Sequence, residues 1–174
     1  MDITQLIEDD HREQRRLFAI LEQIGDSDIE SLSAVWDRLA ALLDAHAEAE
    51  EQLFYPELLQ VGRGADTKPT SAAETEDAIK DHNEIREAVA KVRGCSVGSS
   101  EWRKAVATAN HVNSDHMAEE ERQGLADFRR NAPLELRHAL AVRFAAFEAR
   151  HITGVKPVDK NPKSYIAEHA PAKR

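Results

Sequence analysis

Two short histidine–glutamate motifs in the sequence have a spacing suited to metal binding. His46 precedes Glu50 by four residues, and His116 precedes Glu120 by the same interval. Residues four apart lie on one face of a helix, so each motif presents an imidazole nitrogen and a carboxylate oxygen together. Both groups are common ligands of divalent metal ions. Each motif therefore predicts two ligands that could share one ion.

An internal repeat adds a lone histidine to each motif. Asp10–His11 recurs as Asp81–His82 after 71 residues, and the histidine–glutamate motif recurs after 70. Apolar residues flank both lone histidines at helical spacing, which predicts that they lie on inward faces. A single histidine on such a face is usually a hydrogen-bonded core residue, but recurrence in two halves favours metal binding. The predicted ligands are His11, His46, Glu50, His82, His116 and Glu120.

Six ligands suit two metal ions better than one, because six around one ion would leave no open position. Each ion would take two histidines, and both glutamates would bridge. Nitrogen and oxygen donors without sulfur favour iron, with manganese or zinc less favoured. Cys95 is the only cysteine, so neither a thiolate cluster nor an intrachain disulfide is predicted.

The elements that must position these ligands are predicted to be helices. Capping patterns begin at Asp2, Ser27 and Ser71, and apolar residues follow at helical spacing. We expect two helical hairpins, at about 2–62 and 71–130, and a helix at about 133–151. The predicted fold is all-α, an antiparallel four-helix bundle over residues 1–152 with an additional C-terminal helix. Residues 153–174 contain three prolines and no periodicity, which predicts a tail that covers the bundle or is partly disordered.

The composition of the chain limits the kinds of partner that it is expected to bind. The net charge of -9 argues against nucleic acid and anionic membranes, because both would repel the chain. No apolar run approaches the roughly 18–20 residues that cross a bilayer, and the chain does not open with a signal-like segment. We expect a cytoplasmic monomer whose partners are small molecules.

The sequence resembles the hemerythrin-like (HHE) cation-binding family over roughly residues 2–150. The matching stretches are "DDHREQRRLF", "HAEAEEQLFYPEL", "DHNEIREAV" and "HMAEEERQGLADF". The resemblance implies a four-helix bundle around a non-heme di-iron centre. The pattern departs from that of the oxygen carriers at two positions. Arg86 stands where oxygen carriers have a further histidine, and Glu120 follows His116 by four residues instead of five. An alternative takes His111 with Asp115 or His116 as ligands, although the repeat favours His116 and Glu120.

These departures argue against reversible oxygen storage. The pattern is similar to bacterial family members implicated in handling peroxide and nitric oxide, which favours reaction with H2O2, NO or O2. The first hypothesis is a catalase-like enzyme that disproportionates peroxide, or a module that detoxifies nitric oxide or peroxide. The alternatives are an O2- or NO-binding, iron-storage or sensing module without turnover, and a structural bundle with a buried polar network.

Several residues near the motifs have less certain roles. Glu51 and Glu121 are candidates for contacts around the ligands, although each points about 100° away from its neighbour. On a regular helix Tyr55 lies about 180° from His46, so a packing role is predicted, unless Pro56 kinks the helix. Histidines without a repeat partner are predicted to be structural or on the surface: His111, His138, His151 and His169.

Overall fold

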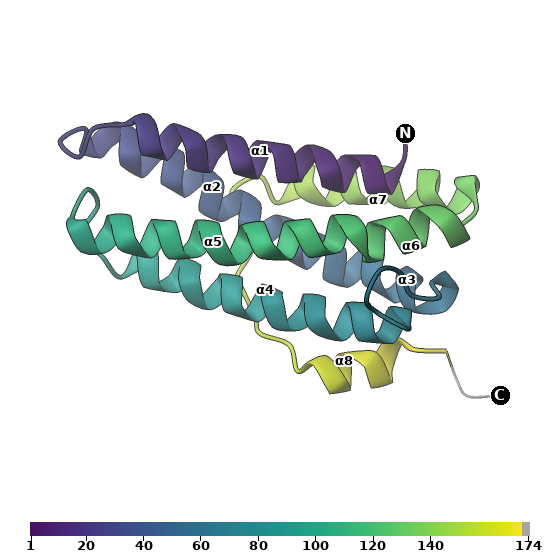
Figure 1. The fold of residues 1–174 in the computed structure, drawn as a ribbon. Helices are drawn as coiled ribbons and strands as arrows, with labels where there is room; N and C mark the ends of the chain where they lie inside the picture. Colours follow the sequence, from purple (N-terminus) through teal and green to yellow (C-terminus); the bar gives the residue numbers. More distant parts are fainter. Residues whose placement is uncertain (172–174) are drawn as a thin grey trace.

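The computed structural model describes residues 1–171, which form helices and connecting turns without a strand (Figure 1). This confirms the predicted all-α bundle. None of the described helices combines the length and the apolarity needed to cross a membrane. The helices are α1 (Ile3–Gln23), α2 (Ile29–Ala49), a π-helical turn (Glu50–Phe54), α3 (Tyr55–Val61), α4 (Ser71–Arg93), α5 (Ser100–Arg122), α6 (Gly124–Asn131), α7 (Leu134–Arg150) and α8 (Pro162–His169).

Side-chain caps begin the long helices close to where the sequence predicts them. Asp2 accepts a hydrogen bond from the Thr4 amide and begins α1, as its capping pattern predicts. Asp28 and Thr70 cap α2 and α4, each one residue away from the predicted serine. Such caps satisfy amide groups that the first helical turn leaves unpaired.

The bundle consists of two helical hairpins that bring four long helical stretches together. The α1 helix packs on α2, and α4 packs on α5, with α3 and α6 continuing α2 and α5 (Figure 1). The additional helix α7 lies against α1 and α2. Along each long stretch, a ligand candidate separates two apolar clusters, one around Phe54, Phe128 and Phe144 and one around Trp36 and Trp102. The candidate site therefore lies between two hydrophobic cores.

The π-helical turn at Glu50–Phe54 ends where proline removes an amide donor. Pro56 cannot donate to a carbonyl one turn earlier, and its ring crowds that position. The Tyr55 amide donates to the Glu50 carbonyl, five residues back, which widens the turn. The turn thus contains one residue more than a regular α-helix, and everything after it is rotated by about 100° relative to the regular spacing.

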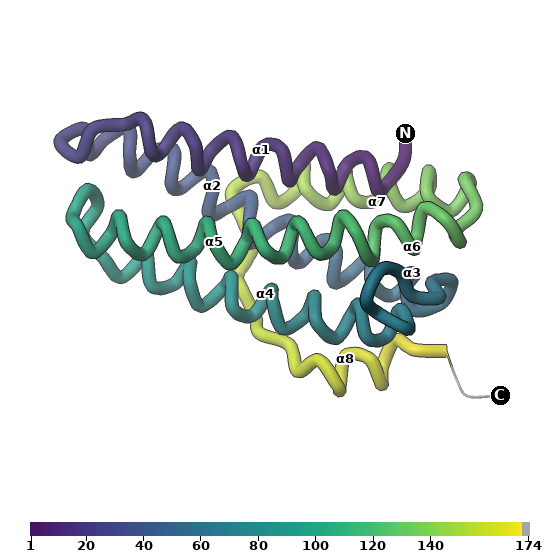
Figure 2. Tube along the Cα trace, viewed as in Figure 1, coloured from purple at the N-terminus to yellow at the C-terminus, as the bar shows by residue number. Residues whose placement is uncertain are grey.

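The C-terminal segment (residues 153–171) differs from its prediction. Figure 2 shows it leaving α7 and passing to the outer side of α4, where it ends in α8. The tail does cover the bundle, but the prediction of no periodic structure is wrong for α8. Asn161 caps this helix and Pro162 occupies its first turn, a position that proline favours. Residues 172–174 of the predicted tail lie outside the described residues.

Candidate metal centre

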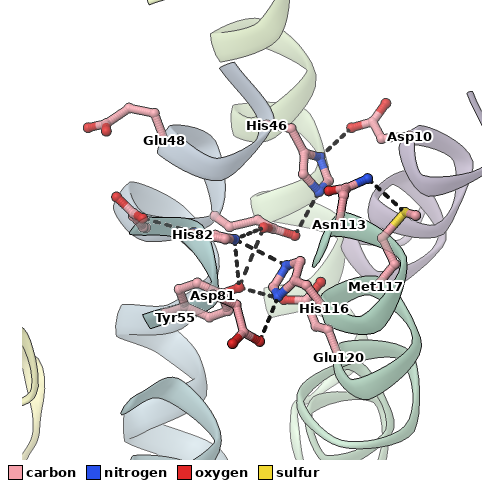
Figure 3. Close-up of polar contacts among 12 residues, drawn as sticks. Asp10, His46, Glu48, Tyr55, Asp81, His82, Asn113, His116, Met117 and Glu120 are labelled. Carbon is pink, nitrogen blue, oxygen red and sulfur yellow. Dashed lines mark hydrogen bonds and ion pairs between the residues drawn. The ribbon is translucent and has the colours of Figure 1, made fainter. Parts of the chain in front are cut away.

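The fold brings five of the six predicted ligands together in two groups that share Glu50. One group consists of His11, His46 and Glu50, and the other of Glu50, His82 and His116. In each group one potential ligand atom per residue lies within 4.8 Å of the others. Figure 3 shows His46 of α2, His82 of α4 and His116 of α5 pointing toward one another. Each group contains two histidines.

Glu50 reaches the histidines of both groups, and Glu120 reaches His11 of the first. One carboxylate oxygen of Glu50 lies 3.2 Å from His46 Nε2, and its other oxygen lies 3.2 Å from His82 Nε2. Glu120 Oε2 lies 3.4 Å from His11 Nε2. His82 Nε2 and His116 Nε2 are 3.2 Å apart. Glu50 is therefore placed as a bridging ligand would be, and Glu120 lies beside His11.

Unpaired buried atoms provide a test of whether these residues fit a metal. Four atoms of the predicted ligands are buried without a hydrogen bond of ordinary geometry, and they face one another in two pairs: His46 Nε2 with Glu50 Oε1 at 3.2 Å, and His11 Nε2 with Glu120 Oε2 at 3.4 Å. Leaving one such atom unpaired costs about 1–3 kcal/mol, so native proteins rarely tolerate several in one place. Metal coordination would satisfy all four. The donor set of imidazoles and carboxylates fits a divalent cation of the iron, manganese or zinc type.

Each of the four imidazoles has a carboxylate at its other nitrogen. His46 Nδ1 lies 3.0 Å from Asp10, and His116 Nδ1 lies 3.3 Å from Asp81. Because an ionised carboxylate only accepts, Nδ1 carries the proton and Nε2 is left as the metal-binding lone pair. The sequence predicts the histidine of each Asp-His pair, but it does not reveal the role of the aspartate, which orients the next histidine of the same hairpin.

The other two imidazoles receive their carboxylate from the opposite hairpin. Glu51 lies 2.8 Å from His82 Nδ1, and Glu121 lies 3.0 Å from His11 Nδ1. The two glutamates after the motifs therefore contact the ligands as the weaker prediction allowed. They point away from their own helical neighbour, but toward the histidine that faces them across the bundle.

When metal is absent, the charges around the site favour the protonated form of the His82 imidazole. Burial alone would lower the pKa of His82, but hydrogen bonds with Glu50 and Glu51 outweigh it and raise the pKa to about 9. Burial would raise the pKa of Glu51, but His82, Arg86 and Lys160 outweigh it and lower the pKa to about 2. Metal uptake must therefore displace protons from imidazole at neutral pH.

The packing prediction for Tyr55 is wrong. Its hydroxyl is buried in the site, where it donates to Glu120 Oε1 at 2.7 Å and lies 3.4 Å from both Glu50 and His82. The π-helical turn explains the difference, because its extra residue moves Tyr55 from about 180° to about 80° from His46. The proline at position 56 was the signal that could have revealed it.

The remaining predicted positions lie outside the ligand groups. His111 is exposed, with 76% of its side chain accessible, and pairs with Asp115 at 3.5 Å. Arg86 is buried and donates to both oxygens of Glu51 at 2.8 and 2.9 Å, so it acts on a carboxylate and not on a metal. The other unrepeated histidines each donate from Nδ1 to a backbone carbonyl: His138 to that of Met1, His151 to that of Phe147 and His169 to that of Tyr165.

A pocket of about 290 Å³ connects the site with solvent between α4 and the α5–α6 stretch. Tyr55, His116 and Glu120 line its inner part, and partly exposed acids, including Asp81 and Glu119, line the rest. Most of this space is open to solvent, and the cavity itself measures about 20 Å³, which is enough for about one water-sized group. It suits a ligand of a few atoms.

Comparisons with known proteins agree with this geometry. Residues 2–126 match the family model described as "Hemerythrin HHE cation binding domain". A curated protein of Nostoc sp., named DNA nickase, is 25% identical over 151 residues, which are 86% of this chain. The chain spans 40% of the length of that relative. No solved structure matches the chain.

Proposed function

Because the chain belongs to the hemerythrin HHE cation-binding domain family, whose members are metal-binding modules, we propose that it holds two iron ions and reacts with small oxidants. His11 and His46 would hold one ion, and His82 and His116 the other. Glu50 and Glu120 would bridge them. The reaction best supported is disproportionation of hydrogen peroxide, with nitric oxide as an alternative substrate of the same centre.

One observation carries this proposal: four imidazoles and two carboxylates converge in a buried site that a small pocket reaches, and four of their atoms lack a hydrogen bond of ordinary geometry. When bound, the ions would supply Lewis acidity and exchange two electrons with the substrate. A structural polar network would be expected to pair its own atoms, because unpaired buried groups cost stability. The pocket excludes large substrates by its volume.

Tyr55 supplies the proton-bearing group of the site. Its hydroxyl lies on the pocket wall and donates to Glu120. Burial, and then the negative charges of Glu120 and Glu50, hold the pKa of Tyr55 well above its ordinary value, so the hydroxyl stays protonated. It can therefore orient a peroxide oxygen by a hydrogen bond and exclude water beside Glu120.

The test measures metal content and oxygen evolution on the same sample. About two irons per chain and oxygen release from added peroxide are expected. His46→Ala should lose both, whereas the matched His111→Ala should keep both, because His111 is exposed. Iron-loaded protein that evolves no oxygen, but changes its visible spectrum reversibly with O2 or NO, would identify a binding module instead. Protein that takes up no metal would refute the centre itself.

The proposed function does not include cleavage of DNA, the activity that the name of the Nostoc relative describes. The net charge of -9 opposes binding to a polyanion, and the chain spans only part of that protein. Metal-loaded protein is therefore expected to leave supercoiled plasmid DNA intact, as agarose gel electrophoresis would show.

A further inference from the structure

The repeat also includes an arginine in each half. Each arginine donates to the glutamate that contacts the lone histidine of its half. In one half, Arg15 donates to Glu121 at 2.9 Å, and Glu121 contacts His11. In the other half, Arg86, which is 71 residues after Arg15, donates to Glu51, and Glu51 contacts His82. The two halves therefore contain matching chains of arginine, glutamate and histidine.

A lysine from outside the repeat breaks this symmetry. Lys160 Nζ contacts Glu51 Oε2 and lies 2.7 Å from Glu48. The Glu51 side chain is fully buried, whereas the Glu121 side chain is 31% accessible. Glu51 is thus shared among His82, Arg86 and Lys160 without solvent, while Glu121 has one arginine and water around it.

The C-terminal segment fixes Lys160 firmly in this position. The Lys160 amide donates to the Asn83 side chain at 3.1 Å, and Asn83 Nδ2 donates to the Lys160 carbonyl at 2.8 Å. Asn83 directly follows His82 in α4. Tyr165 of α8 donates its hydroxyl to the Glu51 carbonyl within the π-helical turn. The contact of Lys160 with Glu51 is therefore built by several independent anchors.

We propose that Lys160 is a positioning residue that makes the two metal positions inequivalent by weakening the pull of Glu51 on the His82 Nδ1 proton. A carboxylate at Nδ1 makes the opposite nitrogen a stronger metal ligand. When two cations share that carboxylate, less of its charge acts on the imidazole, and His82 donates more weakly to its ion. The His82–His116 position then binds a divalent cation less tightly than the His11–His46 position. This inference rests on the proposed centre.

Calorimetric titration of the metal-free protein with Co²⁺ tests it. The wild type should bind in two steps of different affinity. Lys160→Met should tighten the weaker step about 3- to 10-fold, somewhat less than the 10- to 100-fold typical of groups that contact a ligand directly. Lys160→Gln, which keeps a polar group at this place, should act in the same direction, and it replaces the methionine variant if that variant does not fold. Lys160→Arg should retain the wild-type pattern.

Two further variants distinguish the effect of the Lys160 charge from the effect of anchoring the C-terminal segment. Lys163→Met removes an exposed lysine three residues further along the same segment and should change nothing. Tyr165→Phe loosens the segment without changing charge, and should lower the melting temperature while keeping the two steps apart. If Lys160→Met weakens or does not alter the weaker step, or if Tyr165→Phe tightens it equally, the proposal is wrong.

A measurement without metal keeps this inference distinct from the proposed function. In the metal-free protein, the His82 Nδ1 proton resonance should move downfield in Lys160→Met, because its hydrogen bond to Glu51 strengthens, and should stay in place in Lys163→Met. An unchanged resonance overturns the role of Lys160. Failure of the wild type to bind Co²⁺ would instead refute the proposed centre, and the resonance would still decide whether Lys160 acts on His82.

Discussion

Removing the metal is expected to lower the stability of the fold by an amount that the structure allows us to calculate. Without metal, four atoms of the predicted ligands are buried without a hydrogen bond of ordinary geometry, although they face one another in two pairs. At about 1–3 kcal/mol each, the cost is about 4–12 kcal/mol. Protons on the imidazoles satisfy part of it, since the pKa of His46 lies well above its ordinary value: burial lowers it, but Glu50 and Asp10 outweigh burial. The lower limit, about 4 kcal/mol, is therefore expected.

Mass action gives a similar figure. Free metal at about 100 times the dissociation constant stabilises a fold by about 2.7 kcal/mol for each site, or about 5 kcal/mol for two. In a chain of this size, each kcal/mol changes the melting temperature by about 2–4 °C. Chelation should therefore lower the melting temperature by about 8–16 °C. The difference should shrink as the pH falls from 9 to 6, because protons compete with the metal for His82.

Differential scanning calorimetry before and after chelation measures this effect, with elemental analysis on both samples. His46→Ala should lose most of the difference, whereas His111→Ala should keep it. A melting temperature that changes by less than about 2 °C after the metal has demonstrably been removed would refute the reasoning. The six residues would then be a polar network that is stable without an ion.

Three further predictions address the reaction, the pH dependence and the core. Tyr55→Phe should reduce kcat for peroxide about 10- to 100-fold with little change in KM, as an oxygen electrode would show, whereas an unchanged kcat would assign Tyr55 to packing. Burial, and then the charge of Asp127, raise the pKa of Glu74 to about 8, so its neutral form stabilises the fold below about pH 4.5 and that contribution is lost as the pH rises through 8. Urea unfolding at pH 5 and 8 should therefore show a smaller difference in Glu74→Gln than in the wild type; an equal difference would contradict this assignment. Trp102→Ala should lower the unfolding free energy by about 3–5 kcal/mol, because Trp102 is fully buried in the core away from the predicted ligands. The folded variant should keep its metal. Urea unfolding and elemental analysis check the two outcomes.

The ligand set was predictable because helical spacing and the repeat act over short distances. His46 and Glu50 need only one turn of helix to meet, and the recurrence in the second half identified the lone histidines. Tyr55 was misplaced because its position depends on a widened turn, which changes the angle of every later residue. A single departure from regular spacing therefore hid the one hydroxyl of the site.

Contacts between residues far apart in the chain could not be predicted from the sequence for another reason. Lys160 reaches Glu51 over more than 100 residues, and no periodic pattern links the two. The α8 helix is short, and its apolar residues are too few to show helical spacing against three nearby prolines. Its position follows from packing on α4 and from the hydrogen bonds of Lys160 and Tyr165, which only the folded chain reveals.

The exchange of carboxylates between the hairpins has a consequence for the ancestry of the chain. His11 receives Glu121 from the second hairpin, and His82 receives Glu51 from the first. This reciprocal pattern is what a symmetric pair of identical hairpins would produce, since each copy would complete the other. The chain thus has the organisation of a fused dimer. Neither hairpin could form the complete set of contacts alone, so the centre assembles only when the two have docked.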